Sequence, residues 1–207
     1  MPYFNIVAET SENTVVTEYE PVKKRSDSYQ SEAALEQEFI RMLCEQGYEY
    51  LPIHTEKDLV SNLRRKLEEL NDYQFSDTEW EVFFKNAVAN PNEHIVEKTR
   101  KIQEDNIQVL TRDDGSIKNI TLIDKKNIHN NRLQVINQYE VGMDEGARHD
   151  NRYDVTVLVN GLPLVHIELK RRGVAIREAF NQINRYQRES FWAGYGLYEY
   201  IQIFVIS

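Results

Sequence analysis

Apolar residues in the first half of the chain recur with the 3.6-residue period of amphipathic helices. These stripes predict helices over residues 31–46, 56–70, 76–88 and 93–102. Gly47 stands where a helix commonly ends in a left-handed residue, and Ser76 with Glu79 has the spacing of a capping box. Residues 1–27 are polar and without a period, so they predict an arm or a loosely held edge strand.

The second half of the chain has the composition and alternation of β-strands. Strands are predicted over residues 107–110, 117–123, 133–141, 152–159, 164–170 and 200–206, after a short one at 48–53. Asp113-Asp114-Gly115 is typical of a hairpin turn, and apolar spacing over 174–188 predicts one more helix. This order of elements predicts an α/β domain over residues 28–207, with a mixed sheet flanked by helices and a helical insertion at about 56–104.

The last predicted strand is unusual for the end of a protein. Residues 201–206 are apolar almost throughout, as in a strand buried on both faces, and a single residue follows. We therefore expect the chain to be the front piece of a longer protein.

Composition excludes several classes of protein. With 41% hydrophobic and 29% charged residues, the 207-residue chain is not globally disordered. It has no apolar window of about 18 residues and no signal-peptide pattern, which predicts a cytoplasmic protein without a membrane partner. Its one cysteine, Cys44, excludes an intramolecular disulfide and a Cys-rich zinc site, and its place in the first helical stripe predicts a core position.

The charge is unevenly distributed along the sequence. A net charge of −9 argues against a protein that coats nucleic acid. Residues 151–190, however, hold seven cations and four anions, a local charge of +3, which leaves −12 for the remainder. Such a basic island is typical of a localised phosphate-contacting site, although charge clusters are more often solvated faces.

Candidate chemistry lies on the two strand-like runs on either side of Asn160-Gly161. Alternation places one set of aliphatic side chains on the core face: Val155, Val157, Val159, Val165, Ile167 and Leu169. Asp154, Glu168 and Lys170 then share the other face. His166 falls on that face too, where a lone strand histidine is more often structural.

The register of this hairpin follows from the alternation. The two aliphatic faces coincide only if the numbers of paired residues sum to an even number, as for 155 with 167, and the same register places Asp154 beside Glu168. A two-residue Asn160-Gly161 turn would pair 159 with 162 and turn Asp154 away from Glu168. The pattern therefore predicts a three-residue loop or a bulge involving Gly161.

Two carboxylates followed by a lysine have a direct chemical use. Asp154 and Glu168 would hold Mg²⁺ through oxygen ligands, and the metal would polarise a phosphoryl oxygen and lower the pKa of an attacking water. Lys170 would orient or help deprotonate that water and offset negative charge in the transition state. The alternative is an ordinary solvated strand face that carries a glutamate and a lysine, because Glu-x-Lys is a common surface pattern.

Three features weigh against the solvated face. The runs around Asp154 and Glu168 are strongly apolar, and Lys170-Arg171-Arg172 continues into the basic island. The predicted helix that follows carries Gln182 and Tyr186 four residues apart, on one side of the helix.

Together these residues resemble the nuclease module of the PD-(D/E)xK superfamily, and specifically the N-terminal endonuclease domain of the restriction (R) subunit of type I restriction-modification enzymes. Asp154 followed by Glu168-Leu169-Lys170 matches the metal-binding and catalytic motif. Gln182 with Tyr186 matches the Gln-x-x-x-Tyr motif of the RecB-like branch. The resemblance extends back through residues 123–127 and 28–32, so it covers nearly the whole chain from Ser28 onward.

The resemblance implies a PD-(D/E)xK core that hydrolyses duplex DNA with Mg²⁺ as cofactor. It implies Asp154, Glu168 and Lys170 as catalytic residues, with Asp154 and Glu168 as metal ligands. A helical glutamate often joins the metal site of such nucleases, and Glu36 fits best, with Glu32 as its competitor one turn earlier. The expected supporting and DNA-positioning residues are Gln182, Tyr186 and Arg172.

By the same resemblance, cleavage follows ATP-driven translocation, and the partners are DNA and the modification and specificity subunits of a restriction complex. The chain has no Gly-x-x-x-x-Gly-Lys-Ser/Thr loop, so ATP should bind a C-terminal translocase of the parent protein and not this piece. Two alternatives stay open: a catalytically silent, nuclease-like docking platform, and a stand-alone repair or junction-resolving nuclease of the same superfamily.

Overall fold

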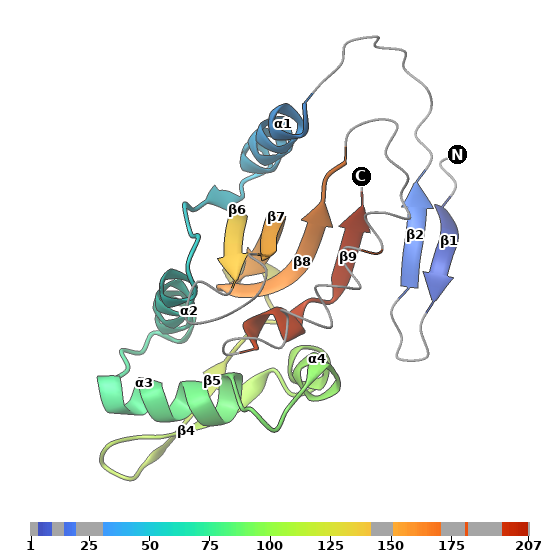
Figure 1. Cartoon of the computed structure of the whole chain (residues 1–207). Helices are drawn as coiled ribbons and strands as arrows, with labels where there is room; N and C mark the ends of the chain where they lie inside the picture. Colours follow the sequence, from blue (N-terminus) through green and yellow to red (C-terminus); the bar gives the residue numbers. More distant parts are fainter. Residues whose placement is uncertain are drawn as a thin grey trace.

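A mixed β-sheet forms the centre of the computed structural model, which describes residues 4–9, 15–19, 31–141, 151–170, 181 and 196–206 (Figure 1). Five strands of this part of the chain follow the order β3-β6-β7-β8-β9. They are β3 (Glu49–Tyr50), β6 (Leu133–Val141), β7 (Asn151–Val159), β8 (Leu162–Glu168) and β9 (Ile203–Ile206). β7 pairs antiparallel with β6 and β8, while β3 and β9 run parallel to β6 and β8. The predicted α/β class with a mixed sheet is confirmed.

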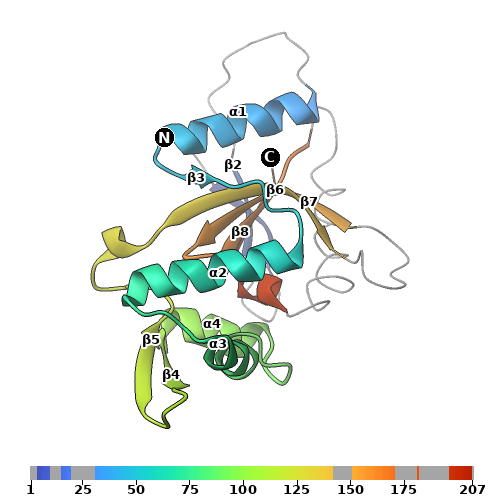
Figure 2. The ribbon, with the colours of Figure 1, turned by 90° about the vertical axis from the view of Figure 1, so that its left-hand side faces the viewer.

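Helices cover both faces of this sheet (Figure 2). On one face α1 (Glu32–Glu45) packs Phe39, Ile40 and Leu43 against a small aliphatic cluster. That cluster consists of Val135, Val155, Val157, Ile167 and Leu169. On the other face α2 (Glu56–Asn71) buries three leucines completely, Leu59, Leu63 and Leu67, in a larger cluster. Each such leucine contributes roughly 2 kcal/mol of burial, so both layers stabilise the sheet.

The larger cluster lies on the face opposite the one that alternation assigned to the core. Ile136, Leu158 and Tyr153 of the sheet join it together with most of the apolar residues between 53 and 122. The predicted aliphatic face is therefore buried, but it forms the smaller of the two clusters. The sheet is apolar on both sides, and alternation with a two-residue period predicts only one apolar face.

The segment between α2 and β6 contributes the rest of the larger cluster. Its elements are α3 (Asp77–Phe83), the π-helical turn η1 (Phe84–Val88), α4 (Ile95–Gln103), the hairpin β4 (Ile107–Thr111) and β5 (Ile117–Thr121), and the 3-10 turn η2 (Ile128–Asn130). The capping box is confirmed: Ser76 Oγ accepts from the Glu79 amide at 3.1 Å, and Glu79 Oε2 accepts from the Ser76 amide at 3.0 Å. The hairpin around Gly115 is confirmed as well.

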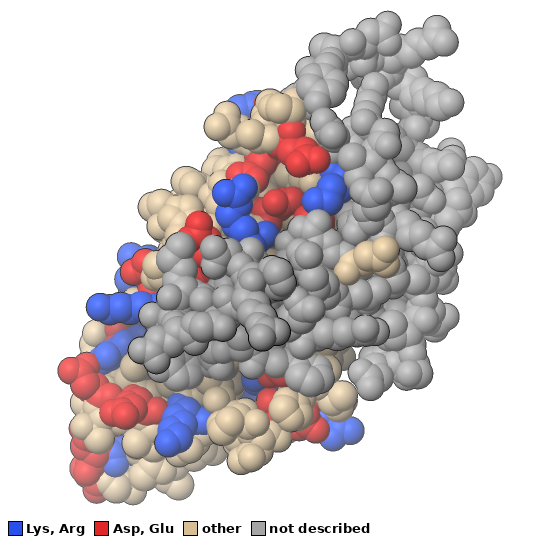
Figure 3. Space-filling view, in the orientation of Figure 1, with Lys and Arg blue, Asp and Glu red and all other residues tan. Residues whose placement is uncertain are grey.

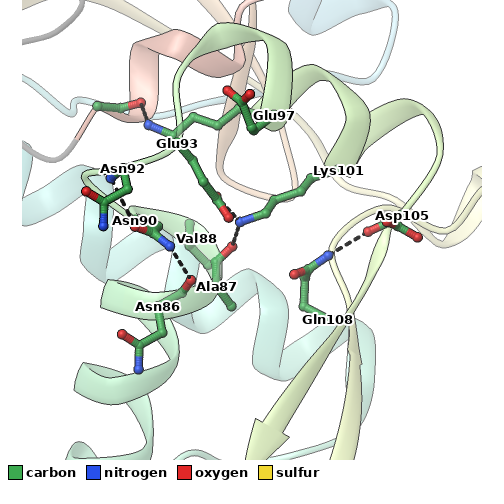
Figure 4. Close-up of polar contacts among 12 residues, drawn as sticks. Asn86, Ala87, Val88, Asn90, Asn92, Glu93, Glu97, Lys101, Asp105 and Gln108 are labelled. Carbon is green, nitrogen blue, oxygen red and sulfur yellow. Dashed lines mark hydrogen bonds and ion pairs between the residues drawn. The ribbon is translucent and has the colours of Figure 1, made fainter.

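A buried lysine ties α4 to the end of the π-helical turn (Figure 4). Lys101 reaches from α4 to the Ala87 carbonyl, at 2.6 Å from Nζ, and forms an ion pair with Glu93. Its ammonium group thereby donates to a backbone carbonyl at the end of the irregular turn.

The remaining elements of the described residues are a hairpin near the N-terminus and a short turn before β9. Within the predicted arm, β1 (Phe4–Glu9) and β2 (Val15–Tyr19) form an antiparallel hairpin, and β2 lies beside β9 (Figure 1). The 3-10 turn η3 (Leu197–Tyr200) leads into β9. The helix predicted over 174–188 lies outside the described residues, except for position 181. None of the helices that the structure describes combines the length and apolar character that a membrane crossing requires.

The prediction that Cys44 belongs to the core is wrong, and Met42 of the same predicted stripe is 46% exposed. α1 meets the sheet along one narrow line through Phe39, Ile40 and Leu43. Because successive residues are rotated by about 100° around a helix, Met42 and Cys44 point away from that line.

The β7–β8 turn corrects one prediction and confirms another. Asn160 and Gly161, with φ of 52° and 85°, form a two-residue turn in which Val159 lies opposite Leu162, so the prediction of a longer loop or a bulge at Gly161 is wrong. The register then shifts between Val157 and Leu158, where β8 carries one extra residue, Leu164. Beyond this bulge Val155 pairs with Ile167, which is the even-sum register that alternation requires.

The tight turn is stable because Asn160 and Gly161 both tolerate positive φ. The Asn160 side chain is fully buried, donates to the Leu122 carbonyl at 3.0 Å and accepts from the Arg132 amide at 2.8 Å. Gly161 packs against the backbone of α2.

We predict that Gly161→Ala destabilises the fold by roughly 2–5 kcal/mol, because a Cβ would lie 2.6 Å from Leu63 Cα and the residue has positive φ. Gly115→Ala is the matched control, since Gly115 has φ of +81° but nothing within 4 Å of the new Cβ. It should cost only about 1 kcal/mol. Urea unfolding of both variants measures the difference, and equal losses would contradict the close packing of the turn on α2.

Candidate active site

Asp154, Glu168 and Lys170 come together where β7 and β8 lie side by side near α1. In the register that pairs Val155 with Ile167, Asp154 comes opposite Glu168. Asp154 Oδ2 accepts a hydrogen bond from the Leu169 amide at 2.9 Å, and Lys170 Nζ donates to Glu168 Oε1 at 2.7 Å. Acidic and basic side chains intermix on the surface between α1 and the end of β8 (Figure 3).

Glu168 is fully buried, which is unusual for a carboxylate. Its Oε1 is paired with Lys170, whereas its Oε2 is buried and accepts no hydrogen bond from the residues that the structure describes. His166 Nε2 lies 3.5 Å from that Oε2 atom. The His166 ring itself is enclosed, with the Tyr153 ring centroid at 5.1 Å and that of Phe204 at 6.3 Å. Within the described part of the chain, Glu168 thus has one oxygen without a hydrogen-bond donor.

The pKa of Asp154 is unusually high for an aspartate. Burial raises its pKa to about 6, and the nearby charges of Glu168 and Glu36 act in the same direction. The Leu169 amide and the Lys170 charge oppose this rise. A carboxyl group that titrates close to neutrality, in contact with other acids, is typical of a functional site.

Lys170 is held as a cation by its acidic neighbours. Burial by itself lowers its pKa, but the hydrogen bond to Glu168 and the charges of Glu168, Asp154 and Glu32 outweigh burial, and the pKa of Lys170 is raised. Lys170 therefore carries a fixed positive charge between two carboxylates.

Both helical candidates lie on α1, but in different surroundings. Glu36 is 8% exposed and accepts hydrogen bonds from the side-chain amides of Asn137, at 2.6 Å, and Gln138. Its charge acts on Asp154, whereas the charge of the exposed Glu32 acts on Lys170. Arg172, Gln182 and Tyr186 lie outside the described residues.

Sequence reasoning did not find Asn137 and Gln138. They belong to an ordinary strand-like run, and the signal that singles them out is conformational: Gln138 has φ of 52°, which is rare for a residue other than glycine. Such strained positions concentrate at functional sites. A single sequence does not reveal this backbone conformation.

The donor set fits Mg²⁺. Among the described residues no group of three or more His, Cys, Asp or Glu side chains is placed to hold a metal ion. Mg²⁺ nevertheless keeps several waters in proteins and is commonly bound through one or two carboxylates, which Asp154 and Glu168 provide. The buried Oε2 of Glu168, which accepts no hydrogen bond from the described residues, is an oxygen of the required type.

The mixed sheet with helices on both faces defines an α/β protein, and comparison with known sequences gives its family. Residues 29–207 match the family described as type I restriction enzyme R protein N terminus, so the chain belongs to this family. The resemblance noted from the motifs is thereby confirmed.

Its relatives include the EcoprrI type I restriction enzyme endonuclease subunit of Escherichia coli, 50% identical over 202 residues. The SsaAORF53P endonuclease subunit of Staphylococcus saprophyticus is 40% identical over 184 residues, and the HindI endonuclease subunit of Haemophilus influenzae is 30% identical over 199 residues. These matches cover 97%, 86% and 86% of this chain. The chain in turn spans 63% of the first relative and 18% of each of the other two.

We predict that Asp154→Asn stabilises the metal-free fold at neutral pH. The pKa of Asp154 is raised from its usual 3.8 to about 6, so the folded state binds the proton more tightly than the unfolded chain. Stability is therefore lost as the pH rises from about 4 through 6, by up to about 3 kcal/mol, and the asparagine variant avoids that loss. Urea unfolding in EDTA at pH 4.5 and 7.5 measures the gain.

Asp124→Asn is the control of opposite sign. Hydrogen bonds from the Asn127 amide and the Asn130 side chain lower the pKa of Asp124, so its ionised form stabilises the fold. Its replacement should cost stability at pH 7.5. A loss of stability for Asp154→Asn at that pH would contradict the conclusion that the surroundings of Asp154 disfavour its ionised form.

Proposed function

We propose that this chain is the Mg²⁺-dependent endonuclease domain of a type I restriction enzyme. It hydrolyses phosphodiester bonds of duplex DNA after translocation by an ATP-driven motor in another part of the parent protein. Its catalytic residues are Asp154, Glu168 and Lys170. The observation that carries the proposal is the convergence of two acids and a partly buried, charged lysine at adjacent strands, in a chain of this family.

The side chains have complementary roles in this reaction. Asp154 and Glu168 present oxygen ligands on neighbouring strands, and the buried Glu168 Oε2 accepts no hydrogen bond from the described residues. Lys170, charged and 2.7 Å from Glu168, orients the attacking water and offsets negative charge that develops on the phosphoryl group. The rigid β7–β8 register keeps the two acids adjacent throughout.

A bound Mg²⁺ would supply Lewis acidity toward the phosphoryl oxygen and lower the pKa of the attacking water. Asp154 and Glu168 would hold it, with Glu36 as a further candidate ligand. The positive charge of Lys170, which lies 2.7 Å from Glu168, would act on the substrate beside it.

The remaining functions of the restriction complex belong to other chains or domains. Modification and specificity subunits recognise the DNA site, and the complex delivers DNA to this domain in the cytoplasm, so the domain needs no strong DNA affinity of its own. The net charge of −9 agrees with this division. Arg172, Gln182 and Tyr186 position the DNA or the catalytic residues.

We predict that Lys170→Ala, in the full-length protein assembled with its partner subunits, lowers DNA cleavage by about 100-fold or more and leaves ATP hydrolysis unchanged. The lysine acts only at the nuclease site, so the motor should be unaffected. Parallel assays of cleavage and ATP hydrolysis measure the two activities.

Lys125→Ala is the matched control, because Lys125 is exposed and donates to the backbone carbonyls of Gln103 and Glu104, away from the proposed site. It should leave cleavage unchanged. Retained cleavage by Lys170→Ala would instead favour a silent docking platform, with the cutting residues elsewhere.

We also predict that Mg²⁺ raises the unfolding temperature of the protein, and that Asp154→Asn or Glu168→Gln abolishes this rise. A ligand that binds only the folded state stabilises it by mass action. Thermal unfolding with and without Mg²⁺ tests this, with Glu69→Gln as a control in an exposed glutamate on α2 that is paired with Lys66. An equal Mg²⁺ effect in all variants would refute the proposed ligands.

A further inference from the structure

We propose that Asn137 and Gln138 are positioning residues that fix Glu36 as the third acidic side chain of the nuclease site. This inference rests on the proposed function and deepens it. It distinguishes Glu36 from Glu32, and it assigns a role to a strained segment of β6 that the catalytic motif does not include.

Neutral side chains hold the buried Glu36 carboxylate. It is 8% exposed, and no lysine or arginine of the described residues forms an ion pair with it. Its two oxygens accept instead from neutral amides, Asn137 Nδ2 at 2.6 Å and Gln138 Nε2. Amide donors satisfy the hydrogen bonds of a buried carboxylate without adding a positive charge beside it. The Glu36 side chain is thus held in place without a cationic partner among the described residues.

Two hydrogen bonds hold the Asn137 side chain. Tyr50 Oη donates to Asn137 Oδ1 at 2.9 Å, while the amide nitrogen donates to Glu36. Exchange of the amide oxygen and nitrogen would place the amide oxygen against the Glu36 carboxylate, which only accepts, whereas the Tyr50 hydroxyl can accept as well as donate. Tyr50 lies on β3, which pairs with β6 beside this point.

The strained backbone at Gln138 makes the double contact possible. In a regular strand, residues 137 and 138 point to opposite faces of the sheet. Gln138 adopts φ of 52° instead, and both side chains then reach the same carboxylate. A conformation that is unfavourable for glutamine is retained where it brings two donors to one acid.

This irregularity lies opposite a proposed catalytic residue. The pairs Asn137 with Val155 and Tyr139 with Tyr153 flank it, and the ladder omits Gln138 and Asp154 between them. His54 Nδ1 lies 3.3 Å from the Gln138 carbonyl and helps to hold the bend. Gln138 Oε1 is buried and accepts no hydrogen bond from the described residues, so it offers one more oxygen to a hydrated cation.

The test is Mg²⁺ affinity, measured by calorimetry on the full-length protein. Asn137→Asp replaces a donor by a charge at constant size, and Gln138→Asn keeps the tolerance for positive φ but shortens the reach of the amide. Each should weaken Mg²⁺ binding by about tenfold, and Glu36→Gln should do the same. Cleavage that is lost at limiting Mg²⁺ should return when Mg²⁺ is raised, which a variant that fails to fold would not show.

A double-mutant cycle separates positioning from a general structural effect. If Asn137 acts through Glu36, Asn137→Asp should add no further loss of affinity to Glu36→Gln. Asn127→Asp, at an exposed asparagine in the loop before β6, is the matched control and should leave Mg²⁺ affinity unchanged.

Three results would overturn the inference. Unchanged Mg²⁺ affinity in the Asn137 and Gln138 variants, while Asp154→Asn abolishes binding, would overturn it and leave the proposed function intact. A loss of affinity for Glu32→Gln but not for Glu36→Gln would do the same. The absence of any Mg²⁺ binding by the unsubstituted protein would overturn the proposed function and this inference with it.

Discussion

The register of the β7–β8 hairpin is the constraint on which the rest of this structure depends. With Val155 opposite Ile167, the aliphatic side chains of both strands pack under α1, and Asp154 comes opposite Glu168. A shift by one residue would turn the aliphatic side chains of one strand away from α1, toward the opposite face of the sheet, and separate the acids. The tight turn at Asn160-Gly161 imposes the wrong parity, and the bulge at Leu164 corrects it. Stability and chemistry therefore select the same pairing.

The three acidic side chains of the proposed site differ in the groups that surround their carboxylates. Glu168 is buried against Lys170, Asp154 is destabilised as an anion by burial and its acidic neighbours, and Glu36 is held by two neutral amides. Such an arrangement costs folding free energy in the absence of a cation. The proposed Mg²⁺ would offset that cost and so couple the stability of the site to its occupancy.

Much of this arrangement followed from local pattern. The 3.6-residue stripes and the capping box at Ser76 placed the helices, and alternation gave the strands and the parity of the hairpin. Arg172, Gln182 and Tyr186 stay predictions, because they lie outside the described residues. Cys44 and the turn at Gly161 were predicted wrongly, and the larger core cluster was not predicted at all. Each depends on which neighbouring element a surface contacts and not on the period of its own segment.

By itself the sequence determined the α/β class, the family and the spacing of Asp154, Glu168 and Lys170, because periodicity and motif spacing are local properties of the chain. Only the tertiary structure decided how Glu36 differs from Glu32 in its surroundings. That choice depends on the left-handed backbone of Gln138 and on Tyr50, which hold two amides against one carboxylate. These contacts join residues about a hundred positions apart, and no local pattern encodes them.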